Sequence, residues 1–444
     1  MEPYAILLSV SCLVVLLAWH FGKKPTAKLP PGPKPLPVVG NMLDIPSAKP
    51  WEAYMDYGRL YGQDIVHFKV FGRHSMIVNS RELAGELFEK RSRIYSDRPY
   101  LAMFDLYIKM GWADVGTVFM PYGSAWRQHR RLIQEGFRDS MAAEYLSIQS
   151  EKTYEFLTNL LEDPNDFRAH IRTLAAATIM GIVYGHDVTS ADDYFVNLAE
   201  RAAEALTTPT GTSAIVNIIP FMRHFPAWFP GCGFQNAARE IRGRVNDMME
   251  KPYSVVVNGI ASPVFFFLSQ TSGTQKPSLL AKYLDRHRAN NGSYNELAAI
   301  KQVCASAYGA GSDTTASALA TFFLSMATHP HIQKRAQEHI DNLLSEGRLP
   351  TWADHPQLQY IEAIMRETLR WQPVTPLGFF HSATSDDTVN GYFIPKGTAL
   401  SGNIWAMTRD PIVYPDPERF NPERFLTEDG TCNDDDVSFT FGFG

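Results

Sequence analysis

The chain has 444 residues, of which 45% are hydrophobic and 20% charged, so it can bury a sizeable core and is neither disordered nor collagen-like. Its formal net charge of -6 gives no electrostatic reason to expect nucleic acid as a partner. Its four cysteines are widely separated and form no Cys-x-x-Cys pair, which argues against a disulfide framework and against a zinc site.

The N-terminal stretch, residues 4–21, is almost entirely apolar and carries no fixed charge. Its length is about the minimum for a helix that spans a bilayer. Lys23 and Lys24 follow it, and positive charge directly after a span keeps the body of a protein in the cytosol. We therefore expect residues 1–22 to form an uncleaved transmembrane signal-anchor, with a cleaved signal peptide or a buried helix as the alternatives.

A basic and proline-rich hinge, residues 23–40, follows the predicted anchor. Residues 29–37 contain five prolines, which fix φ, remove backbone donors and favour a stiff, extended spacer between membrane and body. Residues 41–444 contain no obvious linker, so we expect them to form one folded body.

The body shows strand patterns near both ends and helical patterns between them. Residues 64–70 and 75–78 look like strands, and Asn390-Gly391 is a strong signal for a hairpin turn. Between residues 81 and 348, apolar residues recur every three or four positions. The pattern predicts a mainly α fold with small β-sheets, in the α+β class.

One long helix is expected over about residues 294–327, and its middle contains Gly311, Asp313 and Thr314. A mid-helix glycine costs about 1 kcal/mol relative to alanine, so a flat cofactor or substrate lying against the helix would explain Gly311. Asp313 and Thr314 place an acid beside an alcohol, a pair that can relay protons to a bound oxygen ligand. The alternative is a hydroxyl that only bonds back to a helix carbonyl.

Glu367 and Arg370 are three residues apart in a helical pattern, so they share one helix face and can form an ion pair. The spacing alone is a weak signal, because Glu135 and Arg138 repeat it elsewhere. The first pair is followed by an irregular region with Arg424, which offers a second arginine.

Taken in order, these motifs resemble the cytochrome P450 family over nearly the whole chain, and look closest to its fungal microsomal members. After the apolar N-terminus and the hinge the order is Trp126-x-x-x-Arg130, Ala310-Gly311-x-Asp313-Thr314-Thr315, Glu367-x-x-Arg370, Pro422-Glu423-Arg424-Phe425 and Phe441-x-x-Gly444. Each motif alone can arise by chance, whereas the ordered set is typical of that family. The resemblance implies a cytochrome P450-like fold, with an N-terminal transmembrane helix, that binds haem b.

The resemblance also implies roles for individual residues. Trp126 and Arg130 match a helix position that binds one haem propionate, where an indole N–H and a guanidinium suit a carboxylate. His381 matches a position near the other propionate, with a structural histidine as the alternative. Gly311 is placed with the cofactor-binding residues. A buried charge network would hold the region around the haem, formed by Glu367, Arg370 and Arg424.

In this family a cysteine thiolate holds the haem iron, and the loop that carries it begins with Phe-x-x-Gly. By resemblance Phe441 and Gly444 belong to this loop, and the cysteine ligand would follow beyond Gly444. No cysteine of the chain takes that place; they are Cys12, Cys232, Cys304 and Cys432. We therefore expect no metal ligand within the chain, and a truncation before the axial cysteine.

The first functional hypothesis is a haem-thiolate monooxygenase that inserts one oxygen atom from O2 into a hydrophobic small molecule, in secondary metabolism or xenobiotic oxidation. The chain has no Gly-x-Gly-x-x-Gly after a strand, so an NADPH-cytochrome P450 reductase would supply the electrons. The expected location is the endoplasmic reticulum membrane, with a single span and a cytosolic catalytic body.

The second hypothesis is a truncated, catalytically inactive remnant of such an enzyme. A third and weaker one is an isomerase or dehydratase of the same fold that needs no reductase. Asp313 and Thr314 argue against the third hypothesis, because such an enzyme has less use for an alcohol that protonates oxygen.

Overall fold

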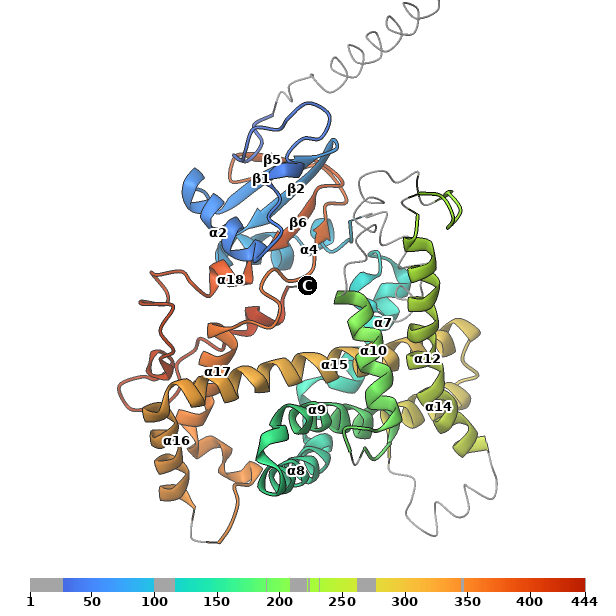
Figure 1. Ribbon diagram of the computed structural model, residues 1–444, viewed down its shortest axis with the longest axis vertical. Helices are drawn as coiled ribbons and strands as arrows, with labels where there is room; N and C mark the ends of the chain where they lie inside the picture. Colours follow the sequence, from blue (N-terminus) through green and yellow to red (C-terminus); the bar gives the residue numbers. More distant parts are fainter. Residues whose placement is uncertain are drawn as a thin grey trace, which may run out of the picture. The chain divides into compact units, whose positions relative to one another are not determined.

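The computed structural model describes residues 27–99, 116–188, 190–207, 222, 224–230, 232–261, 277–344 and 347–443. The chain divides into two compact units (Figure 1). Unit 1 combines Met1–Pro99 with Leu358–Gly444, and unit 2 is Tyr100–Gln357.

Unit 1 is built on a four-stranded sheet. Its strands are β1 (Ile65–Val70), β2 (Arg73–Val78), β3 (His381–Ser382) and β6 (Ala399–Gly402). The order is β1-β2-β6-β3, with β2 antiparallel to β1 and parallel to β6, and β3 antiparallel to β6. Figure 1 shows the early strands in blue beside the late strand β6 in orange-red. The two strands predicted near residues 64–78 are thus confirmed, whereas their pairing with β6 was not predicted.

A separate hairpin pairs β4 (Asp387–Val389) with β5 (Tyr392–Ile394). The two residues between the strands, Asn390 and Gly391, have φ values of 50° and 77°. Two successive positive φ values define the tight turn whose twist matches a hairpin, and Asn-Gly tolerates them best. The predicted turn is confirmed.

Short helices surround the sheet of unit 1. They are η1 (Met42–Asp44), α2 (Pro50–Tyr61), α3 (Arg81–Ala84), the π-helical turn η2 (Gly85–Lys90), α4 (Ser92–Tyr95), α17 (Gln359–Trp371), α18 (Ile404–Met407), η7 (Pro422–Phe425) and η8 (Ser438–Phe441). The sheet buries apolar side chains on both faces, because Met76 and Val78 belong to one core cluster and Ile77 to another.

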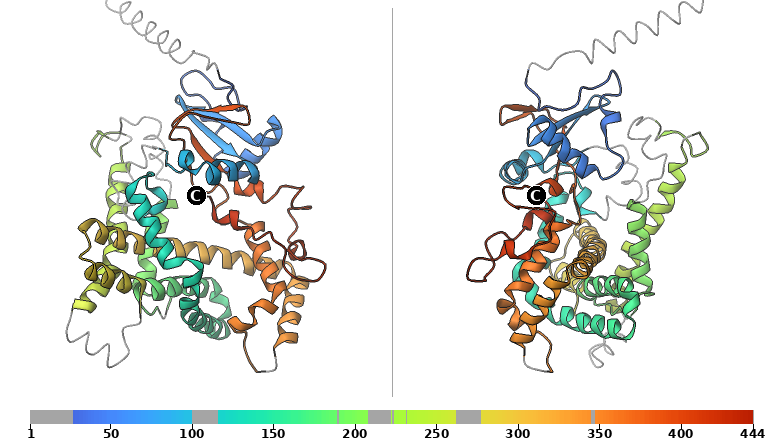
Figure 2. Two further views of the ribbon diagram at one scale, coloured as in Figure 1. Left: turned by 180° about the vertical axis from the view of Figure 1, so that it is seen from behind. Right: turned by 60° about the vertical axis from the view of Figure 1, so that its left-hand side comes forward.

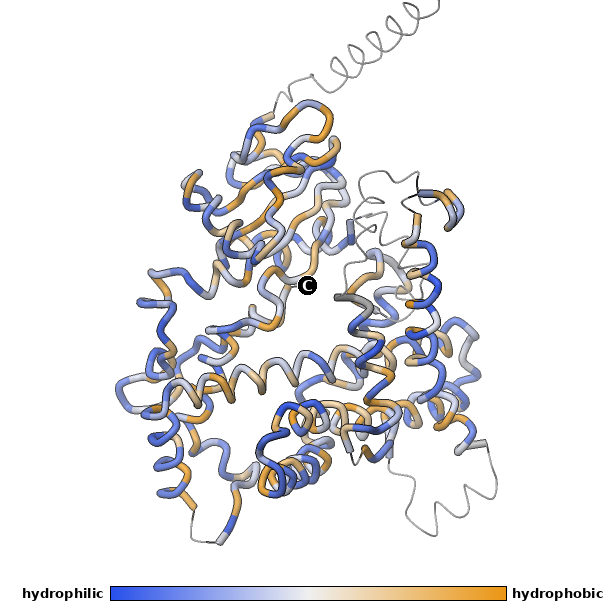
Figure 3. Tube along the Cα trace, in the orientation of Figure 1, coloured by the Kyte–Doolittle hydropathy of each residue, from blue (hydrophilic) through white to orange (hydrophobic). Residues whose placement is uncertain are grey.

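Unit 2 is a helical assembly around one long central helix. Its elements are η3 (Thr117–Phe119), α7 (Ser124–Phe137), α8 (Asp139–Glu162), η4 (Pro164–Asp166), α9 (Phe167–Tyr184), α10 (Tyr194–Thr207), α12 (Phe234–Ala261), α14 (Leu279–Ala289), α15 (Tyr294–Thr328), α16 (Pro330–Leu343) and η6 (Trp352–Gln357). Hydrophobic and hydrophilic positions alternate along helices such as α12 and α16 (Figure 3), as expected for helices with one buried face.

The central helix α15 has the bounds that its sequence predicted, within one residue. It begins after Ser293, whose hydroxyl accepts a hydrogen bond from the amide of Glu296 at 3.2 Å and so satisfies one of the unpaired donors of the first turn. It ends before Pro330, which begins the next helix. Figure 2 shows α9 alongside α15, and the two helices pack closely.

The mainly α architecture with small sheets agrees with the prediction from the sequence. Within the described ranges, the structure contains no helix that is both long and apolar enough to cross a bilayer. The predicted anchor, residues 1–22, lies outside those ranges, as does Gly444.

The proline-rich segment packs against β1 within unit 1. The amide of His67 donates to the carbonyl of Pro31 at 2.9 Å, and Asn41 and Lys69 exchange hydrogen bonds of 2.7 and 2.8 Å. A Cβ added to Gly32 would lie 1.8 Å from the His67 carbonyl oxygen, and one on Gly40 would lie 1.8 Å from that of Lys69. Glycine is therefore required at both contacts with β1.

We predict that Gly32→Ala and Gly40→Ala each lower the free energy of unfolding of unit 1 by at least about 1 to 3 kcal/mol, because the methyl group overlaps backbone that cannot retreat. Gly40, at φ 65°, should be the more sensitive. Urea unfolding followed by amide exchange in β1 measures the change. Gly243→Ala in α12, with nothing near its added Cβ, is the control and should be neutral or slightly stabilising. Equal effects at all three positions would contradict the docking contact.

Two histidines face each other across β1 and β2. Nε2 of His67 lies 2.8 Å from Nδ1 of His74, and the rings are stacked with centroids 5.0 Å apart. Burial, together with the nearby His74 and Lys69, lowers the pKa of His67 to about 4. Burial also lowers the pKa of His74. Both rings are therefore neutral near pH 7, and one N–H donates to the other ring.

This pair predicts acid lability. Between pH 6.5 and about 4 the unfolded chain binds a proton at His67 that the folded chain does not. The free energy of unfolding should therefore be level above this window and fall as the pH drops through it, by at most roughly 3 kcal/mol for this residue. Urea titrations at several pH values measure the slope. His67→Gln should make the slope shallower, whereas His331→Gln, at an exposed histidine outside the pair, should leave it unchanged.

Candidate functional site

The charged residues predicted to form a network lie together in unit 1. Glu367 and Arg370 are fully buried, and the Glu367 carboxylate accepts two hydrogen bonds from Arg370, at 2.6 and 2.9 Å. Nε of Arg424 lies 3.2 Å from the same carboxylate, and the amide of Asn421 donates to it at 2.6 Å. One buried carboxylate is therefore bound by two guanidinium groups and one amide.

The two arginines also hold the chain that follows α18. Arg370 donates to the carbonyls of Thr408 and Pro417, each at 2.9 Å. Arg424 donates to the carbonyls of Pro415 at 3.0 Å and Arg419 at 3.2 Å. A long irregular segment thus obtains its hydrogen bonds from α17 and η7, which explains how it keeps a fixed path without secondary structure.

Unit 1 contains a second basic group that the sequence did not single out. Arg98 donates to the carbonyl of Phe380 at 2.9 Å, but its buried Nε has no hydrogen-bond partner among the described residues. Burial lowers the pKa of Arg98 to about 10, with Asp97 acting in the opposite direction. A buried guanidinium with an unused donor is suited to a carboxylate. In the sequence, the only local feature of Arg98 is that it precedes Pro99, which does not indicate burial or a binding role.

The predicted site residue His381 lies close to this arginine. It is buried in β3, and its Nδ1 donates to the carbonyl of Tyr95 at 2.9 Å, which fixes the tautomer. Burial and then the charge of Arg98 lower the pKa of His381 to about 4. An anion bound beside these two residues would offset both effects, so the pair fits a propionate group.

Of the two residues predicted to belong to the cysteine-bearing loop, the structure describes only Phe441. Phe441 is 78% exposed at the end of η8. Phe443 instead packs 5.7 Å from Phe88 and lies against Gly402. Gly442 between them has φ 95°, a conformation that favours glycine. Gly444, the other predicted residue of this loop, lies outside the described residues.

In unit 2, Trp126 and Arg130 lie on one face of α7, one turn apart. The guanidinium of Arg130 is 5.8 Å from the ring centre of Trp126, and the Trp126 ring is 5.2 Å from that of Tyr122. Arg130 is exposed and Trp126 half-buried. This donor pair has the composition and spacing expected for a carboxylate, and its assignment to a propionate remains a prediction.

Gly311 has a structural explanation that differs from the predicted one. A Cβ at Gly311 would lie 2.9 Å from Cγ1 of Ile179 in α9. The glycine therefore allows α15 and α9 to pack closely, and a bound cofactor is not needed to explain it. Its assignment to cofactor binding stays a prediction.

Asp313 and Thr314 are both exposed on the middle of α15. The Thr314 hydroxyl donates to the carbonyl of Ala310 at 2.7 Å, one turn earlier, and Ser312 does the same to Tyr308 at 2.9 Å. The bond back to the helix, considered above as the alternative, is thus present. It uses the hydroxyl proton but leaves the oxygen of Thr314 able to accept a hydrogen bond.

The cysteines in the described residues do not resemble thiolate ligands. Cys232 and Cys304 are buried in the core of unit 2, and burial raises the pKa of Cys304 strongly. Burial also raises the pKa of Cys432, whose thiol lies 3.4 Å from the carbonyl of Gln359. An iron ligand must be a thiolate, so none of these three is suitable.

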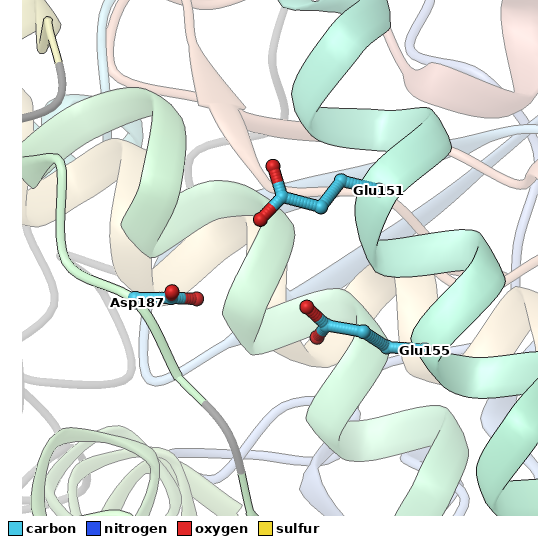
Figure 4. A group of neighbouring side chains, drawn as sticks. All are labelled: Glu151, Glu155 and Asp187. Carbon is cyan, nitrogen blue, oxygen red and sulfur yellow. The ribbon is translucent and has the colours of Figure 1, made fainter.

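Unit 2 has one cluster of three acidic side chains among its described residues. Carboxylate oxygens of Glu151, Glu155 and Asp187 lie within 4.8 Å of one another on the surface of unit 2 (Figure 4). The buried Nζ of Lys152 already contacts Glu155, at 2.8 Å, and Asp187. This lysine supplies the cation that holds the cluster, so we assign no metal to it.

Comparisons with known proteins agree on one family. The family model described as Cytochrome P450 matches residues 30–444. Cytochrome P450 monooxygenase ple1 of Rhodocybe pseudopiperita is 38% identical over 95% of this chain and 79% of its own length. Cytochrome P450 monooxygenase 208 of Postia placenta is 38% identical over 97% and 82%, and cytochrome P450 monooxygenase ppsD of Aspergillus oryzae is 36% identical over 98% and 81%.

The buried carboxylate predicts a large loss of stability on neutralisation. Glu367→Gln would leave two guanidinium groups of unit 1 without a negative partner, so we expect a loss of about 3 to 5 kcal/mol in the free energy of unfolding. Denaturant unfolding measures it. Glu200→Gln, which removes an exposed ion pair with Arg172, is the control and should change stability by less than about 1 kcal/mol. A loss at Glu367 as small as that at Glu200 would refute the network's structural role.

Proposed function

Because the chain belongs to the cytochrome P450 family of haem monooxygenases, we propose that it inserts one oxygen atom from O2 into a hydrophobic small molecule, in secondary metabolism or xenobiotic oxidation. The observation that carries the proposal is the exposed Asp313 and Thr314 pair on the unbroken helix α15. An acid and an alcohol on a helix surface lined with small residues suit proton delivery beside a bound ligand.

Each unit contains one set of groups suited to a haem propionate. In unit 1 the set is Arg98, with its unused buried Nε, and the neutral His381. In unit 2 the set is Trp126 and Arg130 on α7. Charge-assisted hydrogen bonds from such groups hold and orient a carboxylate. When bound, haem supplies the reductive activation of O2 that no side chain can perform.

Thr314 would deliver protons to the bound ligand, and Asp313 would resupply them from water. The Thr314 hydroxyl donates to Ala310, so its oxygen is held in place with its lone pairs directed away from the helix carbonyl. A proton moves through it only if it accepts one from a neighbouring donor as it releases its own. Asp313 is exposed and adjacent in sequence, so its carboxylate can exchange protons with water and resupply the hydroxyl.

The electron donor in this proposal is a membrane-bound NADPH-cytochrome P450 reductase. The support is that α7 presents Arg127, Arg130 and Arg131 to solvent, and that the exposed Arg138 directly follows this helix. A set of exposed guanidinium groups on one helix favours docking of a partner with an acidic surface and raises the association rate. Replacing Arg127 and Arg131, which are not among the proposed propionate ligands, should increase the concentration of reductase that is needed, without changing the haem spectrum.

The location that we propose is the endoplasmic reticulum membrane, with residues 1–22 as a single anchor and the folded units in the cytosol. The support is the apolar composition of residues 4–21 and the lysines that follow.

A non-catalytic ligand-binding form of the family fold is the second candidate. It is favoured by one observation: none of the cysteines in the described ranges, Cys232, Cys304 and Cys432, has the environment of a thiolate ligand. The two candidates differ in a simple spectrum. Chain loaded with haem and reduced under carbon monoxide should show the thiolate-type absorption band if it is a monooxygenase, and no such band if it is the non-catalytic form.

The role of Thr314 is tested by Thr314→Val in chain that shows the band. With reductase and NADPH, we expect at least about a tenfold rise in the ratio of hydrogen peroxide released to oxygen fully reduced to water, because proton delivery is impaired. Thr321→Val is the matched control, since Thr321 donates to the carbonyl of Ser317 at 3.1 Å, two turns further along α15. An unchanged ratio in the Thr314 variant would remove this residue from the mechanism.

A further inference from the structure

A buried hydrogen-bond network joins η3, α7 and α15 in unit 2. At its centre is His129, which is 2% exposed. Its Nδ1 lies 3.1 Å from the hydroxyl of Thr117, and its Nε2 lies 3.1 Å from Oε1 of Gln302. The amide of Thr117 also donates to the hydroxyl of Ser306, at 3.4 Å.

The direction of each bond follows from the chemistry of its partners. Oε1 of Gln302 can only accept, so Nε2 of His129 carries the proton. Nδ1 of the neutral ring is then the acceptor, and Thr117 donates its hydroxyl proton to it. Burial lowers the pKa of His129, opposed by the bond to Gln302, which agrees with the neutral ring. The imidazole of His129 thus accepts a hydrogen bond from Thr117 in η3 and donates one to Gln302 in α15.

Thr117 lies in η3, near the N-terminal end of the part of unit 2 that the structure describes. Its backbone and its side chain are both used: the amide bonds to α15, the hydroxyl bonds to α7, and the carbonyl accepts from the amide of Met120 at 3.3 Å. This residue is therefore held by polar contacts on three sides.

The face of α15 that receives these bonds continues toward the proposed proton-relay residues. At about 100° per residue, Gln302, Ser306 and Asp313 lie within about 40° of one another around the helix. His129 itself lies on α7 between Trp126 and Arg130, the proposed propionate ligands. The network therefore joins η3 to α7 and α15, the two helices of unit 2 that carry residues of the proposed site.

An apolar side chain of similar size would fill the same space, so packing alone does not require a histidine here. A fully satisfied buried polar network fixes a single arrangement, because any displacement leaves a donor or acceptor unpaired at a cost of about 1 to 3 kcal/mol. We infer that His129 is a positioning residue, which holds η3 at Thr117 against α7 and α15, the two helices that carry residues of the proposed site. The relevance of this inference to that site rests on the proposed function.

The test is amide hydrogen exchange of the purified full chain, compared with a His129→Phe variant. We expect protection of residues 116–120 to fall at least tenfold, while α9 and the second half of α15 keep theirs. Thr117→Val removes the same bond from its other partner and should give the same local loss. Because both changes break the bond between Thr117 and His129, their effects on exchange at residues 116–120 should be less than additive in the double variant.

A conservative substitution at His129 distinguishes a positioning role, which needs a hydrogen-bond acceptor, from a role in packing alone. The Oδ1 of an asparagine can take the place of Nδ1 as the acceptor for Thr117, so His129→Asn should keep most of the protection that His129→Phe loses. His331→Phe, at an exposed histidine in α16 of the same unit, is the control and should leave exchange at residues 116–120 unchanged.

Unchanged exchange at residues 116–120 in His129→Phe would overturn the inference, and so would an equal loss throughout α9 and α15, which would indicate a purely structural histidine. The measurement needs no haem and no reductase. Failure of the carbon monoxide test would thus reject the proposed function without affecting this result, and the reverse also holds.

Discussion

Unit 1 depends on one buried carboxylate. Glu367 accepts hydrogen bonds from Arg370, Arg424 and the amide of Asn421, and the two arginines in turn bind the carbonyls of the irregular chain between α18 and η7. Removing two cations and an anion from water is favourable only if every remaining donor finds an acceptor, and here the backbone supplies them. The ion pairs around Glu367 and the path of the irregular chain between α18 and η7 therefore depend on each other.

Much of this architecture could be predicted, because its determinants are local in sequence. Ser293 caps α15, Asn390-Gly391 turns the hairpin, and three-residue spacing places Glu367 beside Arg370. Contacts between distant segments could not be predicted. β2 pairs with β6 more than 300 residues away, and neither strand encodes its partner. The unused donor of Arg98 depends on burial, which a single arginine in a sequence does not reveal.

The sequence and the structure also explain some residues differently. Gly311 was predicted to allow a cofactor to approach, and the structure adds that its missing side chain makes room for Ile179 of α9. The role of His129, which is one residue before Arg130, could not be predicted, because its two hydrogen-bond partners are 12 and 173 residues away. In both cases the deciding neighbour is on another helix, so helix periodicity within one segment carries no information about it.

The docked N-terminal segment has a consequence for self-association. β1 is the outermost strand of its sheet, and an uncovered edge strand is a template on which other chains can add strands and aggregate. Residues 31–41 occupy hydrogen-bonding positions of this edge, and their prolines cannot donate to a further strand. The segment that leads out of the predicted anchor thus also shields the sheet from unwanted polymerisation.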